Sequence, residues 1–122
     1  MPAQNAPLAS SHAQGRTDVP LIEQTIGDFF ADMAARQPDR EALVSRHQGL
    51  RYSYAGLHAE ARRLASALLG LGLDKGDRVG IWSHNNAEWV LMQLATAQVG
   101  LVLVNINPVS YTHLTLPTIC SV

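Results

Sequence analysis

Hydrophobic and polar positions between residues 75 and 99 predict a strand followed by a helix. The short apolar run RVGIW at 78–82 is typical of a strand, and the turn-forming sequence SHNN at 83–86 closes it. Apolar residues then recur at helical spacing, at Ala87, Val90, Leu91, Leu94 and Ala95. This spacing predicts a helix with one apolar stripe.

The pattern changes at Gly100, where the missing Cβ permits the left-handed conformation that ends a helix. The run LVLVNI at 101–106 is nearly unbroken apolar sequence, which predicts a strand buried on both faces of a parallel sheet. Residues 89–106 also have almost the length of a membrane-spanning helix. Gln93 and the other polar residues that interrupt them favour a helix plus a buried strand.

Three further elements are predicted upstream of this region. Thr25 is a suitable N-cap for a helix through Gln37, with an apolar stripe formed by Ile26, Phe29, Phe30 and Met33. Residues 41–45 and 51–53 flank a turn that contains Gly49, which predicts a β-hairpin. Ser53 then caps a second helix, whose apolar positions are Leu57, Ala61, Leu64, Leu68 and Leu71.

Composition limits the chain to one small domain. It has 122 residues, a formal net charge of −1 and 16% charged residues, so no basic surface for nucleic acid is indicated. Cys120 is the only cysteine, which excludes a disulfide framework and favours a reducing, cytoplasmic location. The first residues lack the basic and apolar segments of a secretory signal.

The region from about Pro20 to Pro108 resembles a known family. The sequences PLIEQTIGDFF, ARQPDREALV and GDRVGIWSHNNAEWVLMQLATAQVGLVLVNINP are similar to the N-terminal subdomain of adenylate-forming, AMP-binding ligases. The resemblance is greatest to medium-chain and long-chain acyl-CoA synthetases. Peptide-synthetase adenylation domains usually have a Tyr-Val-Pro-Leu-Asp type of run at residues 104–108, where this chain has VNINP.

The resemblance implies an α/β fold, a small and partly parallel sheet flanked by helices. It also implies that the complete enzyme converts a fatty or similar carboxylic acid, ATP and coenzyme A into acyl-CoA, AMP and pyrophosphate, with Mg²⁺. The family's Ser/Thr/Gly-rich loop, its aromatic-Thr-Glu run, its ribose-binding Asp and its C-terminal Lys do not occur in this sequence. We therefore expect no catalytic, cofactor-binding or metal-binding residue here, an inert fragment, and as partner the rest of its own synthetase domain.

Three segments are expected along the chain. Residues 1–19 are poor in apolar sequence and predict a flexible leader, and residues 20–108 form the N-terminal part of the AMP-binding domain. Residues 109–122 carry no charge and match a translated sequencing-library adapter, which predicts an artefact of non-biological origin. This interpretation removes Tyr111, His113 and Cys120 as functional candidates.

Ser83, His84 and Asn85 are the remaining candidates for ligand binding, because they follow the carboxyl end of a predicted parallel strand. Turn formation, together with helix capping by Asn85 or Asn86, explains the same residues without a ligand. The glycines at 70, 72 and 76 do not match a dinucleotide fingerprint, and Lys75 lacks the sequence of a phosphate loop. The histidines at 47, 58 and 84 lack the spacing of metal ligands.

Two rival functions stay open from the sequence. One is a freestanding small α/β binding module. The other is a different adenylate-forming ligase, such as a peptide-synthetase adenylation domain or a luciferase-like enzyme.

Overall fold

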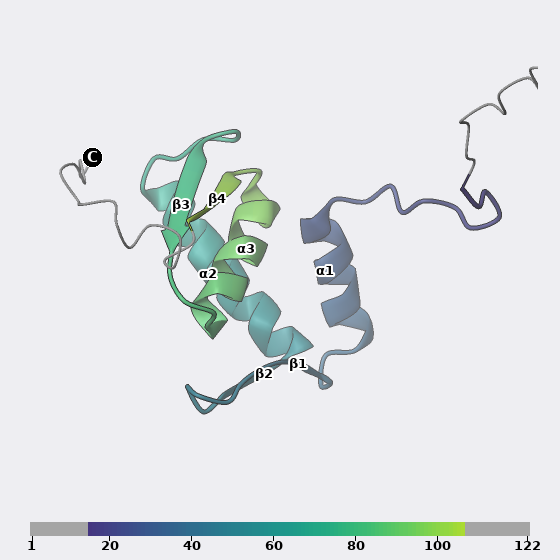
Figure 1. Ribbon diagram of the computed structural model, residues 1–122, viewed down its shortest axis with the longest axis horizontal. Helices are drawn as coiled ribbons and strands as arrows, with labels where there is room; N and C mark the ends of the chain where they lie inside the picture. The colour runs from purple at the N-terminus through teal and green to yellow at the C-terminus, as the bar shows by residue number, and fades with distance from the viewer. Residues whose placement is uncertain (1–14, 107–122) are drawn as a thin grey trace, which may run out of the picture.

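The fold was analysed in a computed structural model that describes residues 15–106 (Figure 1). The described elements are α1 (Ile26–Arg36), β1 (Glu41–Ser45), β2 (Leu50–Ser53), α2 (Tyr54–Gly70), β3 (Arg78–Trp82), α3 (Ala87–Val99) and β4 (Val102–Ile106). They match the predicted order of helices and strands and confirm an α/β fold. The predicted tail at 109–122 and most of the predicted leader lie outside the described residues.

The helices begin at the predicted capping residues. Thr25 Oγ1 accepts a hydrogen bond from the backbone N–H of Asp28 at 3.1 Å, and Ser53 Oγ accepts one from Gly56 at 3.2 Å. At the other end of α3, Gly100 adopts a left-handed conformation with φ of 73°. Each cap satisfies a backbone group that the first or last turn of a helix leaves unpaired.

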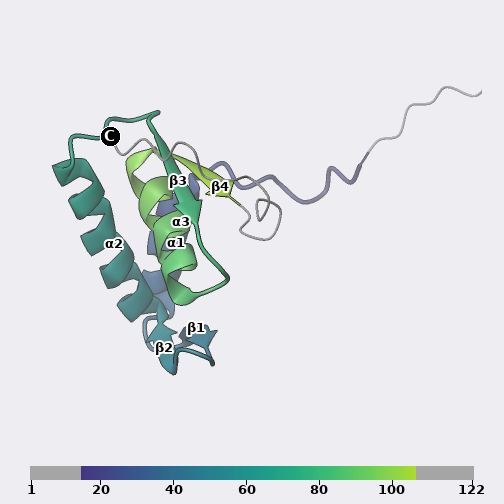
Figure 2. The same ribbon diagram turned by 60° about the vertical axis from the view of Figure 1, so that its left-hand side comes forward.

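The strands form two separate pairs (Figures 1 and 2). β1 and β2 are antiparallel, with a register irregularity near Glu41, and Gly49 in their turn has φ of 68°. β3 and β4 are parallel, with Arg78 opposite Val102 and Trp82 opposite Ile106. The hairpin lies near the start of α2, whereas the parallel pair lies beside α3 (Figure 2).

The core lies where α2 and α3 meet the parallel pair. Its buried members are Ala65 and Leu68 from α2, Ala95 from α3, and Leu101 just before β4. Small side chains at the contact let the two helices approach closely. The half-buried Val79 of β3 packs against the same cluster, so the sheet has one face on the core.

The other face of the parallel pair is uncovered among residues 15–106, which contradicts the prediction that 101–106 is buried on both faces. Trp82, Val102 and Val104 are 51%, 47% and 40% exposed. The physical reason is that the described chain supplies one helical layer, and that layer lies on the side of Val79 and Leu101. Apolar composition correctly predicted a strand but not the presence of a second covering layer.

The stripe of α1 and one position of the α2 stripe also differ from the prediction. Ile26 and Phe29 of α1 are exposed, and the residues that α1 buries are Gly27 and Ala34. Leu71, the C-cap residue of α2, is also exposed, whereas Leu57, Ala61 and Leu68 are buried as predicted. Small residues are therefore the buried positions of α1, where large ones were expected.

The apolar sequence at 89–106 divides into a helix and a strand, as predicted. α3 ends at Val99, and the chain reverses through Gly100 before β4. No helix within residues 15–106 combines the length and the apolar character needed to cross a membrane.

Candidate functional site

Residues 83–86 form the loop that follows β3 at the carboxyl end of the parallel pair. Ser83 Oγ accepts a hydrogen bond from Asn86 Nδ2 at 2.8 Å and donates one to the carbonyl oxygen of His84 at 3.1 Å. His84 and Asn85 are exposed. The loop therefore has the location of a ligand-binding loop in an open α/β sheet, while its serine is held by the loop itself.

Asn86 connects this loop to α3. Its Oδ1 accepts a hydrogen bond from the backbone N–H of Trp89 at 2.9 Å, which is the geometry of a helix N-cap. Capping by one of the two asparagines was predicted, and the structure assigns it to Asn86. The turn and the cap account for Ser83 and Asn86 without a ligand.

A second contact to the start of α3 comes from Gln48 at the tip of the hairpin. Gln48 Oε1 accepts hydrogen bonds from Ser45 Oγ at 2.6 Å and from the backbone N–H of Ala87 at 2.8 Å. Gln48 Nε2 donates to Glu88 Oε2 at 2.7 Å. Ser45 is buried, so Gln48 also supplies a hydrogen-bond partner to its hydroxyl.

No pattern in the sequence singles out Gln48. Its partners on α3 lie 39 and 40 positions further along the chain, so no short motif contains both. A glutamine in a turn beside a glycine is an ordinary surface residue by composition. Only the docking of the hairpin against α3 reveals its role.

The same contact changes the acidity of Glu88. The hydrogen bond from Gln48, together with the backbone N–H of Glu88 itself, lowers the pKa of the Glu88 carboxyl from its ordinary value of 4.5. A weaker attraction to His47 acts in the same direction, and partial desolvation opposes it. Glu88 therefore stays ionised in the first turn of α3, where a negative charge is favourable.

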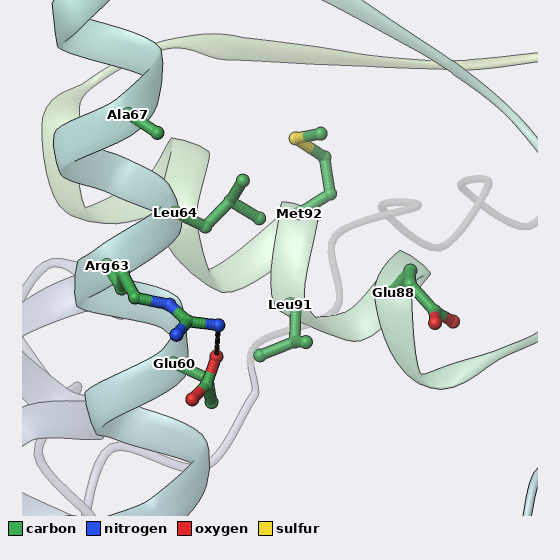
Figure 3. A pocket seen from close by; sticks show the side chains of 7 residues that line it. All are labelled: Glu60, Arg63, Leu64, Ala67, Glu88, Leu91 and Met92. Carbon is green, nitrogen blue, oxygen red and sulfur yellow. Dashed lines mark hydrogen bonds and ion pairs between the residues drawn. The ribbon is translucent and has the colours of Figure 1, made fainter.

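A hollow of about 430 Å³ lies between α2 and α3 (Figure 3). Leu64 and Ala67 line it from α2, and Leu91 and Met92 line it from α3. The Glu60–Arg63 ion pair, 2.6 Å long, lies at its rim. Glu88 also lines the hollow, and its carboxylate accepts the hydrogen bond from Gln48. The rest of the lining is apolar apart from the Glu60–Arg63 pair, and it contains no nucleophilic side chain.

Other residues considered from the sequence lie in turns or in packing contacts. Gly72 and Gly76 have φ of 83° and 95° in the turn after α2, which agrees with a turn and not with a dinucleotide fingerprint. His58 packs edge-on against Phe30, with ring centroids 5.8 Å apart. Among residues 15–106, no group of three or more His, Cys, Asp or Glu side chains could hold a metal ion.

A family model described as AMP-binding enzyme matches residues 30–120 of this sequence. The chain belongs to the AMP-binding enzyme family. This membership confirms the family resemblance seen in the sequence. The match continues past residue 108, and the adapter origin of residues 109–122 and the boundary at 108 stay predictions.

Relatives and solved structures agree with this family. The mitochondrial medium-chain acyl-CoA ligase ACSF2 of Mus musculus is 50% identical over 98 residues, which are 80% of this chain and 16% of that protein. The fatty acyl CoA synthetase of Mycobacterium tuberculosis has a TM-score of 0.67 and 34% identity over 69% of this chain and 17% of its own. The Klebsiella oxytoca NpsA N-terminal subdomain, bound to anthranilyl-AMSN, has a TM-score of 0.65 and 31% identity over 69% and 21%.

These members of the AMP-binding family are much longer than the part that matches. The chain spans 16% of the length of the mouse relative. The described scaffold thus corresponds to a minor part of a complete family member, and the solved NpsA subdomain shows that this part lies within an N-terminal unit in that protein.

The cytoplasmic location expected from the cysteine content is wrong. The matching ACSF2 ligases of Mus musculus, Rattus norvegicus and Homo sapiens are mitochondrial proteins, and this finding overturns the cytoplasmic prediction. A single cysteine does not distinguish one reducing compartment from another. The cysteine count was therefore too weak an observation for that prediction.

Proposed function

We propose that the complete protein containing this chain is an ATP-dependent acyl-CoA synthetase. It joins a fatty or similar carboxylic acid to coenzyme A, with AMP and pyrophosphate as the other products. The observation that carries the proposal is the 50% identity over 98 residues to a medium-chain acyl-CoA ligase. The structural similarity to a fatty acyl CoA synthetase supports the same substrate class.

Within this enzyme, the described residues have a supporting role. The core of α2, α3 and the parallel pair holds the loop at 83–86 at the carboxyl edge of the sheet, and the loop's own hydrogen bonds set its shape. When bound, ATP and Mg²⁺ supply the activated phosphate and neutralise its charge. The family's Ser/Thr/Gly-rich loop and its other catalytic motifs do not occur in this sequence, so we assign ATP, Mg²⁺ and coenzyme A binding to the rest of the synthetase.

A second adenylate-forming function has a specific observation in its favour. The NpsA subdomain is 31% identical and has nearly the same TM-score as the fatty acyl CoA synthetase. An adenylation domain that delivers its acyl group to a carrier protein would use the same scaffold. The sequence VNINP at residues 104–108 favours the coenzyme A branch.

The test is acid-dependent exchange of pyrophosphate into ATP by the complete enzyme, followed by thioester formation. We expect exchange with medium-chain or long-chain fatty acids and acyl-CoA formation when coenzyme A is added. Exchange without acyl-CoA formation would favour the carrier-protein alternative. Absence of exchange with every acid would contradict both and would favour a binding module.

The DNA upstream of the tail provides an independent test against the freestanding module. Unassembled reads from a separate library should continue in frame past Asn107 into a Ser/Thr/Gly-rich loop. A natural stop codon near Asn107 would support the module instead.

A further inference from the structure

Two side-chain hydrogen bonds join the hairpin to α3 within residues 15–106, and Gln48 makes both of them. Its amide oxygen binds the first N–H of α3, and its amide nitrogen binds the first acidic side chain of that helix, Glu88. Asn86 caps the same helix by binding the N–H of Trp89. Two different side chains therefore satisfy two different free N–H groups at one helix end, and only Asn86 is local in sequence.

We propose that Gln48 is a positioning residue that fixes where α3 begins and thereby holds the 83–86 loop at the carboxyl end of the parallel strands. Asn86 and Ala87 are consecutive, so holding the Ala87 N–H also restrains the loop that ends at Asn86. The inference rests on the proposed function only for its consequence for activity. Its structural content concerns the hairpin, the loop and α3.

The contacts of Gln48 with α3 require an acceptor at one side-chain atom and a donor at the other. The amide of Gln48 uses its oxygen as an acceptor from Ser45 and Ala87, and its nitrogen as the donor to Glu88. A carboxylate at position 48 can still accept the hydrogen bonds from Ser45 and Ala87, but it cannot donate one to Glu88. Its negative charge would also lie beside that of Glu88. An amide at position 88 supplies the missing donor from the other side. The change Gln48→Glu should therefore be corrected by Glu88→Gln.

The experiment measures hydrogen–deuterium exchange and fatty-acid activation in the complete enzyme for Q48A, Q48E, E88Q and the double variant Q48E/E88Q. Gln93→Glu is the matched control, because it makes the same change on the exposed side of α3. We expect exchange in peptides covering 84–90 to rise about fivefold in Q48A, the effect of losing one helix cap. Q48E should show a smaller rise that the double variant reverses, and kcat/KM should follow the same order.

Unchanged exchange at 84–90 in Q48A would overturn the proposal, as would a failure of E88Q to correct Q48E. An equal rise across the hairpin, α2 and α3 would also overturn it, because that pattern indicates general destabilisation. If Q48A does not fold, the Q48E and double variants still decide the question. Absence of fatty-acid activation in the unaltered enzyme would refute the proposed function and leave the exchange result valid.

Discussion

At the scale of single residues, Gly27 determines how closely α1 approaches α3. A Cβ at this position would lie 3.0 Å from the Cα of Gln98 and 3.3 Å from the carbonyl oxygen of Ala97. Both are backbone atoms, which cannot move aside as the end of a flexible side chain can. The absence of a side chain at residue 27 is therefore a requirement of helix packing.

We predict that Gly27→Ala lowers the free energy of unfolding by about 1–3 kcal/mol, the usual effect of overfilling a packed contact. The loss occurs although alanine is the better helix former. Urea denaturation measures the change. Gly56→Ala in α2 is the control, since its Cβ would meet only Ser53 Oγ at 3.5 Å, and it should be neutral or stabilising. Equal effects at the two positions would contradict the role of close approach.

The lowered pKa of Glu88 predicts that the folded protein loses stability as the pH falls. Its pKa is lowered in the folded protein by the hydrogen bond from Gln48. A carboxyl whose folded pKa is depressed stabilises the fold above its unfolded pKa, and this stabilisation disappears as the pH falls through the folded value. Thermal unfolding between pH 7 and pH 3 should show this loss in the unaltered protein and a weaker one in Glu88→Gln. Parallel pH profiles for the two proteins would contradict the assignment.

The role of a single residue was predictable where its partner lies close to it in the sequence. Thr25 and Ser53 are correct as caps because a cap and its partner lie three positions apart. Ile26 and Phe29 were assigned to a buried stripe because they are large and apolar, yet Gly27 and Ala34 are buried instead. Helical spacing gives the relative angles of side chains but not which face the partner helix selects.

At the scale of elements, α3 depends on caps at its first turn. We predict that Asn86→Ala destabilises the protein by about 1 kcal/mol or more, because it removes the acceptor for the Trp89 N–H and the donor to Ser83 Oγ. Asn85→Ala, at the exposed neighbouring position, should change stability little. Differential scanning calorimetry compares the two. A larger loss at residue 85 would place the cap there.

The elements themselves were largely predictable, because each boundary has a local signal. Gly100 ends α3 in the left-handed conformation that the sequence predicted, and β4 begins two residues later. The double burial of β4 was not predictable from its composition, because burial depends on which other layers are present. The contact of Gln48 with α3 was missed for the same reason: it is a property of docking between elements.

At the scale of the whole molecule, the parallel pair presents an apolar face that no described element covers. We predict that Val102→Thr with Val104→Thr reduces self-association of the 122-residue chain, since threonine keeps β-propensity and adds a hydroxyl. Light scattering at increasing concentration measures the effect. Val79→Thr, on the core face, should instead destabilise the fold. Unchanged scattering in the double variant would exclude this face as the site of association.

The position of α2 links the local unfolding of the two strand pairs. This helix contacts both β1 and β2 at its start, and it shares the core with Val79 and Leu101 further along (Figure 2). Neither strand pair has a separate hydrophobic cluster among the described residues. Amide protons in the two sheets should therefore lose protection in a single step, as one foldon rather than two, with α2 as the last segment to exchange.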